Sequence, residues 1–347
     1  MLVVSNSFFK NWVLTCLSLI CIACSDSEIR ERDSFFVKGN ARLNTGEYQE
    51  ALRYYNEAIR LDSTFADAYN NRGIAYAEQA KYGRAVIDYT QAINLKQGFA
   101  DAFYNRANAY LQLQDYEKSL ADLDSVEQYY PDSAYVFFTK GFTLAEVRSY
   151  QEAIRAMNQA IALDSTNAEA FVNRGTIYYY QQMYDSADQD IKRALMLNSK
   201  EANAYNLQGL VATEMDNFSQ ALDAFNQAMN LTPFQPFFLN NRGYLYLQMG
   251  EMDKALEDIN RSIQLDPSNS YAYRNKGIYN LAEDNLASAI SNLEQAMDMN
   301  ENTDKVQYFL AKAYLQAGDK KKACEYLYQA SLQSVEDATT LYESQCL

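Results

Sequence analysis

Five asparagines along the chain are separated by 34 or 68 residues: Asn71, Asn105, Asn173, Asn241 and Asn275. A side-chain amide carries two N–H donors and a carbonyl acceptor, so it can bond both the N–H and the C=O of an extended peptide backbone. A row of such amides on one face would hold a peptide with little sequence preference. The same amides could instead make contacts inside the fold, and the sequence leaves both interpretations open. Thr139 and Leu207 interrupt the row.

Six aromatic residues near the middle of the chain form a second set with binding chemistry: Tyr104, Tyr135, Phe138, Phe142, Tyr179 and Tyr180. Tyr135, Phe138 and Phe142 stand at i, i+3 and i+7, which places them on one side of a helix. Exposed, clustered aromatic side chains are typical of binding hot spots. The alternative is that these rings pack between neighbouring helices.

Several kinds of chemistry are excluded by what the chain lacks. Histidine, the side chain most used for acid–base catalysis near neutral pH and the commonest metal ligand, is absent from the 347 residues. Glycine-rich phosphate loops are absent as well. We therefore expect no enzyme activity, no metal and no cofactor. Catalysis by carboxylates alone stays open, although aspartates and glutamates scattered over helix surfaces are more typical of a solvated face. The formal net charge of −15 argues against nucleic acid as a partner, because its binding depends on lysines and arginines that neutralise phosphates.

The elements that position these residues follow from a 34-residue period. A column of small residues makes the period visible: Gly39, Gly73, Ala107, Gly141, Gly175, Gly209, Gly243, Gly277 and Ala311. A constant period of this length is typical of a solenoid, in which each unit buries its apolar face against its neighbours. The low content of 12 glycines and 4 prolines favours an all-α fold.

The period and its residue pattern resemble the tetratricopeptide repeat. The second unit shows the pattern as Tyr69, Gly73, Tyr76, Ala85, Tyr89 and Ala92. The resemblance covers about 306 residues and implies nine tandem units over residues 32–337, each with helix A at positions 1–14 and helix B at about 15–31. The units would stack into a right-handed superhelix. Residues 338–347 are predicted to cap it.

The resemblance also implies which residues line the concave groove, because positions 2, 5, 6, 9, 12 and 13 of helix A face it in the family. The five asparagines and six aromatic residues named above then become groove residues. Acidic residues occupy position 2 of four units: Asp33, Asp67, Asp101 and Glu169. These carboxylates could favour basic or neutral ligands, or simply form a solvated rim.

The arginines at position 7 have a structural explanation. Each unit with arginine at position 7 has aspartate at position 23, which gives four pairs: Arg72–Asp88, Arg106–Asp122, Arg174–Asp190 and Arg242–Asp258. Units without this arginine lack the aspartate. We infer an ion pair between helices A and B inside the unit, with a net contribution on the order of 1 kcal/mol.

The N-terminus predicts a bacterial lipoprotein. Lys10 precedes an apolar run from Trp12 to Ala23, which is short for a membrane span of about 20 residues and suits a signal peptide over residues 1–23. The run ends in Ala23-Cys24, which resembles a lipobox with Cys24 as the lipidated residue, followed by an acidic tether over 24–31. An uncleaved anchor and ordinary secretion are the alternatives. We expect export and attachment to a membrane, with the outer membrane favoured, on its periplasmic or surface face.

Two cysteines near the C-terminus could form a disulfide. Cys324 lies in the ninth unit and Cys346 lies in the tail. An exported compartment permits such a bond. Two separate thiols are the alternative.

Together these features predict a scaffold or assembly factor of the bacterial cell envelope that binds an extended peptide or a partner helix in its groove. The resemblance to envelope repeat lipoproteins supports this through architecture alone. A glycan-binding surface lipoprotein is the alternative, because tyrosine and asparagine also suit sugars. We expect a protein or peptide partner, a membrane contact through Cys24 and no nucleic acid.

Overall fold

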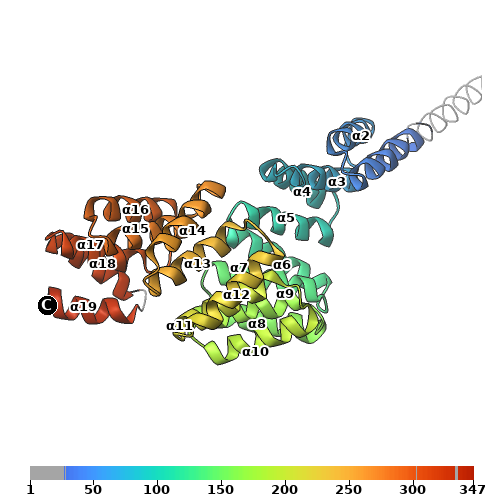
Figure 1. Ribbon diagram of the computed structural model, residues 1–347. Helices are drawn as coiled ribbons and strands as arrows, with labels where there is room; N and C mark the ends of the chain where they lie inside the picture. The colour runs from blue at the N-terminus through green and yellow to red at the C-terminus, as the bar shows by residue number, and fades with distance from the viewer. Residues whose placement is uncertain (1–26, 28, 302, 333–334) are drawn as a thin grey trace, which may run out of the picture. The chain divides into compact units, whose positions relative to one another are not determined.

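The computed structural model describes residues 27, 29–301, 303–332 and 335–347, and regular structure in these ranges is helical (Figure 1). Consecutive helices pack as antiparallel pairs, one pair per 34-residue repeat. The all-α solenoid of helical hairpins predicted from the sequence is thereby confirmed. The signal peptide and the Cys24 lipidation site lie outside the described residues.

The chain divides into two compact parts, residues 1–165 and 166–347, which we call the N-terminal part and the C-terminal part. The boundary falls at the end of the fourth repeat, two residues before the fifth begins at Ala168. Helices of the N-terminal part are residues 29–44, α2 (Tyr48–Leu61), α3 (Ala66–Ala77), α4 (Tyr82–Leu95), α5 (Ala100–Gln112), α6 (Tyr116–Tyr129), α7 (Ala134–Glu146) and α8 (Tyr150–Leu163).

The C-terminal part contains the remaining repeats and a final helix. Its helices are α9 (Ala168–Tyr180), α10 (Tyr184–Leu197), α11 (Ala202–Glu214), α12 (Phe218–Leu231), α13 (Pro236–Gln248), α14 (Met252–Leu265), α15 (Ser270–Ala282), α16 (Leu286–Met299), α17 (Val306–Gln316), α18 (Lys320–Leu332) and α19 (Glu336–Cys346). Helix A of a typical repeat thus spans positions 1–13 and helix B spans positions 17–30, slightly shorter than predicted.

The small residue at position 8 lets helices A and B of one repeat approach closely. A Cβ atom built on Gly73 of α3 would lie 2.5 Å from Cε1 of Tyr89 in α4, and Tyr89 is itself buried. The same collision would occur between Gly209 and the ring of Phe225. Position 8 therefore sets the distance between the two helices, and the aromatic or large apolar residue at position 24 fills the space.

Helix A ends in the same way throughout. The residue at position 15 has a positive φ in every repeat, and only three of these residues are glycine. They are Gly46, Ala80, Gln114, Arg148, Gln182, Asp216, Gly250, Asp284 and Gly318. Next to this left-handed residue, the N–H of Lys81 bonds the carbonyl of Tyr76 at 2.9 Å. A left-handed residue just after a helix is a common helix stop, because it directs backbone N–H groups to the last free carbonyls.

The ninth repeat and the cap depart from the regular pattern. Helix α17 begins at Val306, repeat position 3, after Lys305 with φ +55°. Helix α19 begins two residues before the predicted cap, and its Leu341 and Tyr342 pack against the cluster of Leu327 and Ala330. A disulfide joins Cys324 of α18 to Cys346 of α19. Of the two possibilities left open by the sequence, the structure contains the bond.

A pair of glycine substitutions tests the close approach at position 8. Gly73→Ala should destabilise the chain by about 1–3 kcal/mol, because the new methyl group collides with a buried ring. Gly83→Ala in α4 is the matched control, since a Cβ there meets nothing within 4 Å. The control should be neutral or stabilising by up to about 1 kcal/mol through helix propensity. Thermal unfolding followed by circular dichroism measures both. Equal effects of the two substitutions would contradict the packing.

Candidate binding groove

Helices A of the second, third and fourth repeats are joined by side-chain hydrogen bonds between position 5 of one repeat and position 6 of the next, 35 residues later. Asn105 Nδ2 donates to Asn70 Oδ1 at 3.0 Å. The hydroxyls of Tyr104 and Thr139 lie 3.0 Å apart in the equivalent place one repeat on. We call this series the inter-repeat ladder. Thr139, which interrupts the asparagine row in the sequence, is one of its members.

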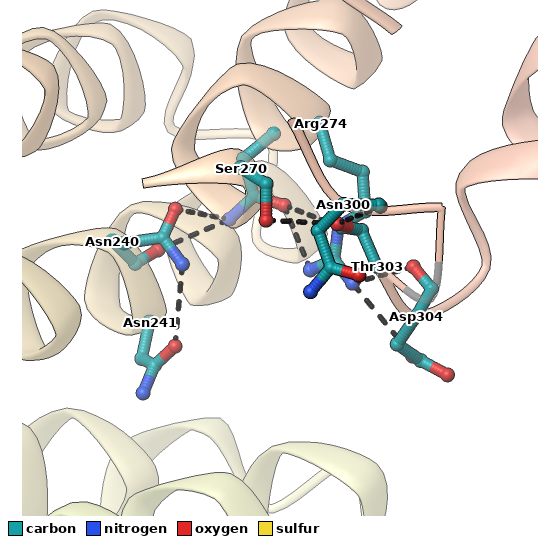
Figure 2. A network of polar contacts seen from close by, with 8 residues as sticks. Asn240, Asn241, Ser270, Arg274, Asn300, Thr303 and Asp304 are labelled. Atoms are coloured by element: carbon teal, nitrogen blue, oxygen red, sulfur yellow. Dashed lines mark hydrogen bonds and ion pairs between the residues drawn. The ribbon is translucent and has the colours of Figure 1, made fainter. Parts of the chain in front are cut away.

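The C-terminal part contains the same ladder. Asn241 Nδ2 donates to Asn206 Oδ1 at 3.0 Å, and Asn275 Nδ2 donates to Asn240 Oδ1 at 2.8 Å. Figure 2 shows Asn240 and Asn241 side by side, with the Asn240 amide donating to Asn241 Oδ1. Asn275 is 0 % exposed, so a groove ligand cannot reach it. The prediction that Asn275 contacts a ligand is corrected, because its amide is enclosed between repeats.

A buried arginine extends this network toward the ninth repeat. Arg274 donates through Nε to Asn275 Oδ1 at 3.1 Å and through Nη1 to the carbonyl oxygen of Asp304 at 2.9 Å (Figure 2). The hydroxyl of Thr303 contacts that of Ser270 at 2.8 Å. These bonds hold the irregular start of the ninth repeat against α15.

Asn71 and Asn173 are also engaged by the protein. Asn71 Nδ2 donates to Asn40 Oδ1 at 2.8 Å, and Asn71 Oδ1 accepts from Asn70 at 3.1 Å. Asn173 Nδ2 donates to the carbonyl oxygen of Glu169 in its own helix at 3.0 Å. The predicted asparagine row is therefore mainly part of the internal packing, although Asn71 and Asn105 also border a hollow.

That hollow lies on α3, α5 and α7 of the N-terminal part and has a volume of about 490 Å³; we call it the groove pocket. Its polar wall contains the amides of Asn70, Asn71 and Asn105. Three tyrosines also line it: Tyr104, Tyr130 and Tyr135. Apolar lining comes from Ile74, Val126 and Val136, and the single charged lining group is Asp101. Tyr130 is a groove residue that the sequence analysis missed.

Aromatic rings continue from the groove pocket along α7. The ring centroids of Tyr104 and Tyr135 are 5.3 Å apart, and Tyr135 stacks with Phe138 at 6.4 Å. Tyr135 is 62 % exposed and Phe142 is 36 % exposed. Burial raises the pKa of Tyr104, so its phenol stays protonated and can act as the donor to Thr139. The structure thus brings together Tyr104, Tyr135 and Phe138. With Phe142, which follows one turn later on α7, we call these four residues the aromatic cluster.

The other two aromatic residues belong to the C-terminal part. Tyr179 and Tyr180 at the end of α9 have ring centroids 5.6 Å apart, and Tyr184 lies 6.2 Å from Tyr179. Burial raises the pKa of Tyr179 well above its ordinary value. Tyr180 is half exposed, at 47 %. Tyr180 is therefore the more accessible of the two.

All four predicted Arg–Asp ion pairs are confirmed. Arg72 makes a bidentate contact with Asp88 at 2.6 and 2.7 Å, and Arg106, Arg174 and Arg242 repeat the geometry with their aspartates. The four aspartates are buried. Arg72 Nη1 also bonds Asn56 Oδ1 of the preceding repeat at 2.7 Å. The pair therefore links repeats as well as the two helices of one repeat.

A periodic signal could have identified the ladder partners that the sequence analysis missed. Asn70, Asn206 and Asn240 each stand 35 residues before a residue of the row. An alignment of the repeats at the 34-residue period does not reveal these pairs. The hydrogen bond joins position 5 of one repeat to position 6 of the next, so the two residues stand in different columns of the alignment.

Within the described ranges, no cluster of three potential metal-ligating side chains occurs. The described helices also include none with the length and apolar character needed to cross a membrane.

The ion pairs are expected to stabilise the fold without contacting ligand. Arg174→Ala should cost about 2–4 kcal/mol, because Asp190 would stay buried without its partner. Partner affinity should change less than about twofold. Gln208→Ala is the matched control, since Gln208 occupies the same position in a repeat that has Ala224 in place of the aspartate. Urea unfolding and a binding titration measure both properties. A loss of affinity without a loss of stability would contradict the structural role.

Comparison with known proteins supports the repeat assignment. Models described as tetratricopeptide repeats match residues 66–99 and 168–201, 101–133, 236–269 and 280–339, and a model described as TPR repeat matches residues 39–80. No curated protein sequence matches the chain.

Solved structures share the fold at low sequence identity. The "APC/C hetero-tetramer Cut9-Hcn1" is 15 % identical with a TM-score of 0.54, over 93 % of this chain and 85 % of that one. Pseudomonas aeruginosa pilF is 18 % identical with a TM-score of 0.52, over 60 % and 94 %. Since the repeat period, the helical hairpins and the matching models agree, the chain is a tetratricopeptide repeat protein.

Proposed function

We propose that the chain is a non-enzymatic scaffold that holds a partner protein in the groove of its N-terminal part. The observation that carries this proposal is the aromatic cluster, which lies beside the groove pocket and leaves large ring surfaces exposed. Exposed rings next to a hollow are the surfaces that dominate binding energy in protein interfaces. A peptide in extended form or a single partner helix fits such a surface.

The inter-repeat ladder preorganises this surface, because it holds groove side chains in place in the free protein. Tyr104 is held by its contact with Thr139, and Asn105 is held by Asn70. Side chains that are fixed in the free protein lose little entropy on binding. Their remaining hydrogen-bonding capacity suits the backbone of a peptide.

The absence of histidine and the composition of the groove pocket favour binding over catalysis. One carboxylate, three amides and three phenols line it. These groups offer hydrogen bonds and ring surfaces, and Asp101 is the single carboxylate among them.

We further propose that the protein works in the bacterial cell envelope, anchored through Cys24, with the outer membrane favoured. The lipobox-like sequence supports the anchor. The Cys324–Cys346 disulfide supports export, because stable disulfides form mainly in oxidising compartments.

Partner capture tests the scaffold proposal. Phe138→Ala combined with Phe142→Ala should abolish recovery of envelope proteins with the anchored chain, while circular dichroism shows unchanged helicity. Ile87→Ala is the control, since Ile87 is 69 % exposed on α4 and outside the aromatic cluster. Undiminished capture by the double variant would count against the groove. Binding to a glycan array without any captured protein would favour the sugar-binding alternative.

Metabolic labelling tests the anchor. Wild-type chain should incorporate palmitate and partition with membranes, whereas Cys24→Ser should lose both properties because the acyl-accepting thiol is gone. Continued palmitate incorporation in Cys24→Ser would rule out Cys24 as the lipidated residue.

A further inference from the structure

The groove pocket contains a carboxylate whose equivalents in neighbouring repeats are paired with cations. Asp33, Asp67 and Asp101 occupy position 2 of the first three repeats. Asp33 accepts from Arg32 at 2.7 Å, and Asp67 accepts from Lys96 Nζ at 3.1 Å. Asp101 is approached by the hydroxyl of Tyr130 at 3.4 Å, and no ion pair to it occurs within the described residues.

Asp67 has an ion-pair partner and Asp101 has none in the described part of the chain because the residue at one repeat position differs. Lys96 of the second repeat and Tyr130 of the third both stand at position 31, directly after helix B. A lysine at this position reaches back to the carboxylate at position 2. The tyrosine leaves the negative charge of Asp101 uncompensated and adds a ring to the pocket wall.

The rest of the groove pocket suits a cation. Tyr130 is 47 % exposed and Tyr135 is 62 % exposed, so both offer ring surface to a ligand. The nearby guanidinium of Arg106 is held by Asp122 and Thr90. An ammonium or guanidinium group beside a carboxylate and aromatic rings gains from both ion pairing and cation–π attraction.

We propose that the groove pocket binds a cationic side chain, lysine or arginine, of the partner polypeptide. Asp101 is the counter-ion, and Tyr104, Tyr130 and Tyr135 surround the aliphatic stem and its charged end. The inference rests on the proposed function and adds the chemical class of the group that the groove selects. The acidic chain, with a formal net charge of −15, also attracts basic partners over longer distances.

The first test uses the full chain in detergent and two kinds of probe. N-acetyl-lysine methylamide and its neutral norleucine counterpart are titrated by ligand-observed NMR. The lysine probe should bind about 10-fold more tightly, the ratio expected from one ion pair and one cation–π contact together. Asp101→Asn should reduce lysine binding to the norleucine level. Asp67→Asn, at the same repeat position but paired with Lys96, should leave it unchanged.

Tyr130→Lys is the sharpest variant, because it installs the internal cation that the second repeat already has. Lysine-probe binding should fall at least as far as in Asp101→Asn. Tyr130→Phe removes the hydroxyl but keeps the ring, and it should retain binding. Equal binding of lysine and norleucine probes to the wild type, or full lysine binding by Tyr130→Lys, would overturn the proposal.

A random-peptide display library separates this inference from the scaffold proposal. If the peptides selected by the wild type are enriched in lysine and arginine, and this enrichment disappears with Asp101→Asn, both the cation site and the scaffold proposal are supported. Peptides that depend on Phe138 and Phe142, but show no enrichment of basic residues, would overturn the cation site and leave the scaffold standing. A library from which wild type selects no peptide would count against both.

Discussion

The hydrogen bond between position 5 of one repeat and position 6 of the next is the interaction on which the binding surface depends. It fixes how helices A lie beside one another, and the groove pocket opens on those helices. Asn70–Asn105 and Tyr104–Thr139 are two examples from the N-terminal part. The arginine–aspartate pairs and the small residues at position 8 complete the rigid frame.

The sequence allowed most of the fold to be predicted, because a 34-residue period repeats every packing contact and makes each column visible. The arginine–aspartate pairs were predictable for the same reason. The end of helix A was harder to predict, since six of the nine left-handed residues, such as Ala80 and Gln114, are not glycine. The packing of helix B against helix A, rather than the intrinsic conformational preference of the residue type, sets the backbone conformation of these residues. The cap helix α19 carried no periodic signal of its own.

The candidate site was predicted less completely. The aromatic cluster could be identified because Tyr135, Phe138 and Phe142 share a helix face. The role of the asparagines could not, since an amide suits a ligand and an inter-repeat contact equally well. Asn275 turned out to be enclosed, whereas Asn71 and Asn105 border the groove pocket. Tyr130 and Lys96 share repeat position 31 in the sequence, but the contacts of Lys96 with Asp67 and of Tyr130 with Asp101 required the structure. Once the internal pairs are assigned, the rings, the amides and the Asp101 carboxylate remain as the groups that we propose for ligand binding.

Site-specific photo-crosslinking in living cells would show whether the partner contacts the groove. A benzophenone amino acid is placed at Tyr135, in the groove, and at Ile87, an exposed residue of α4 outside the aromatic cluster. If the partner lies in the groove, discrete crosslinked protein species should form at Tyr135, and the same species should be absent at Ile87. Crosslinking of the same species at Ile87 alone, or equally at both positions, would contradict the groove as the binding surface.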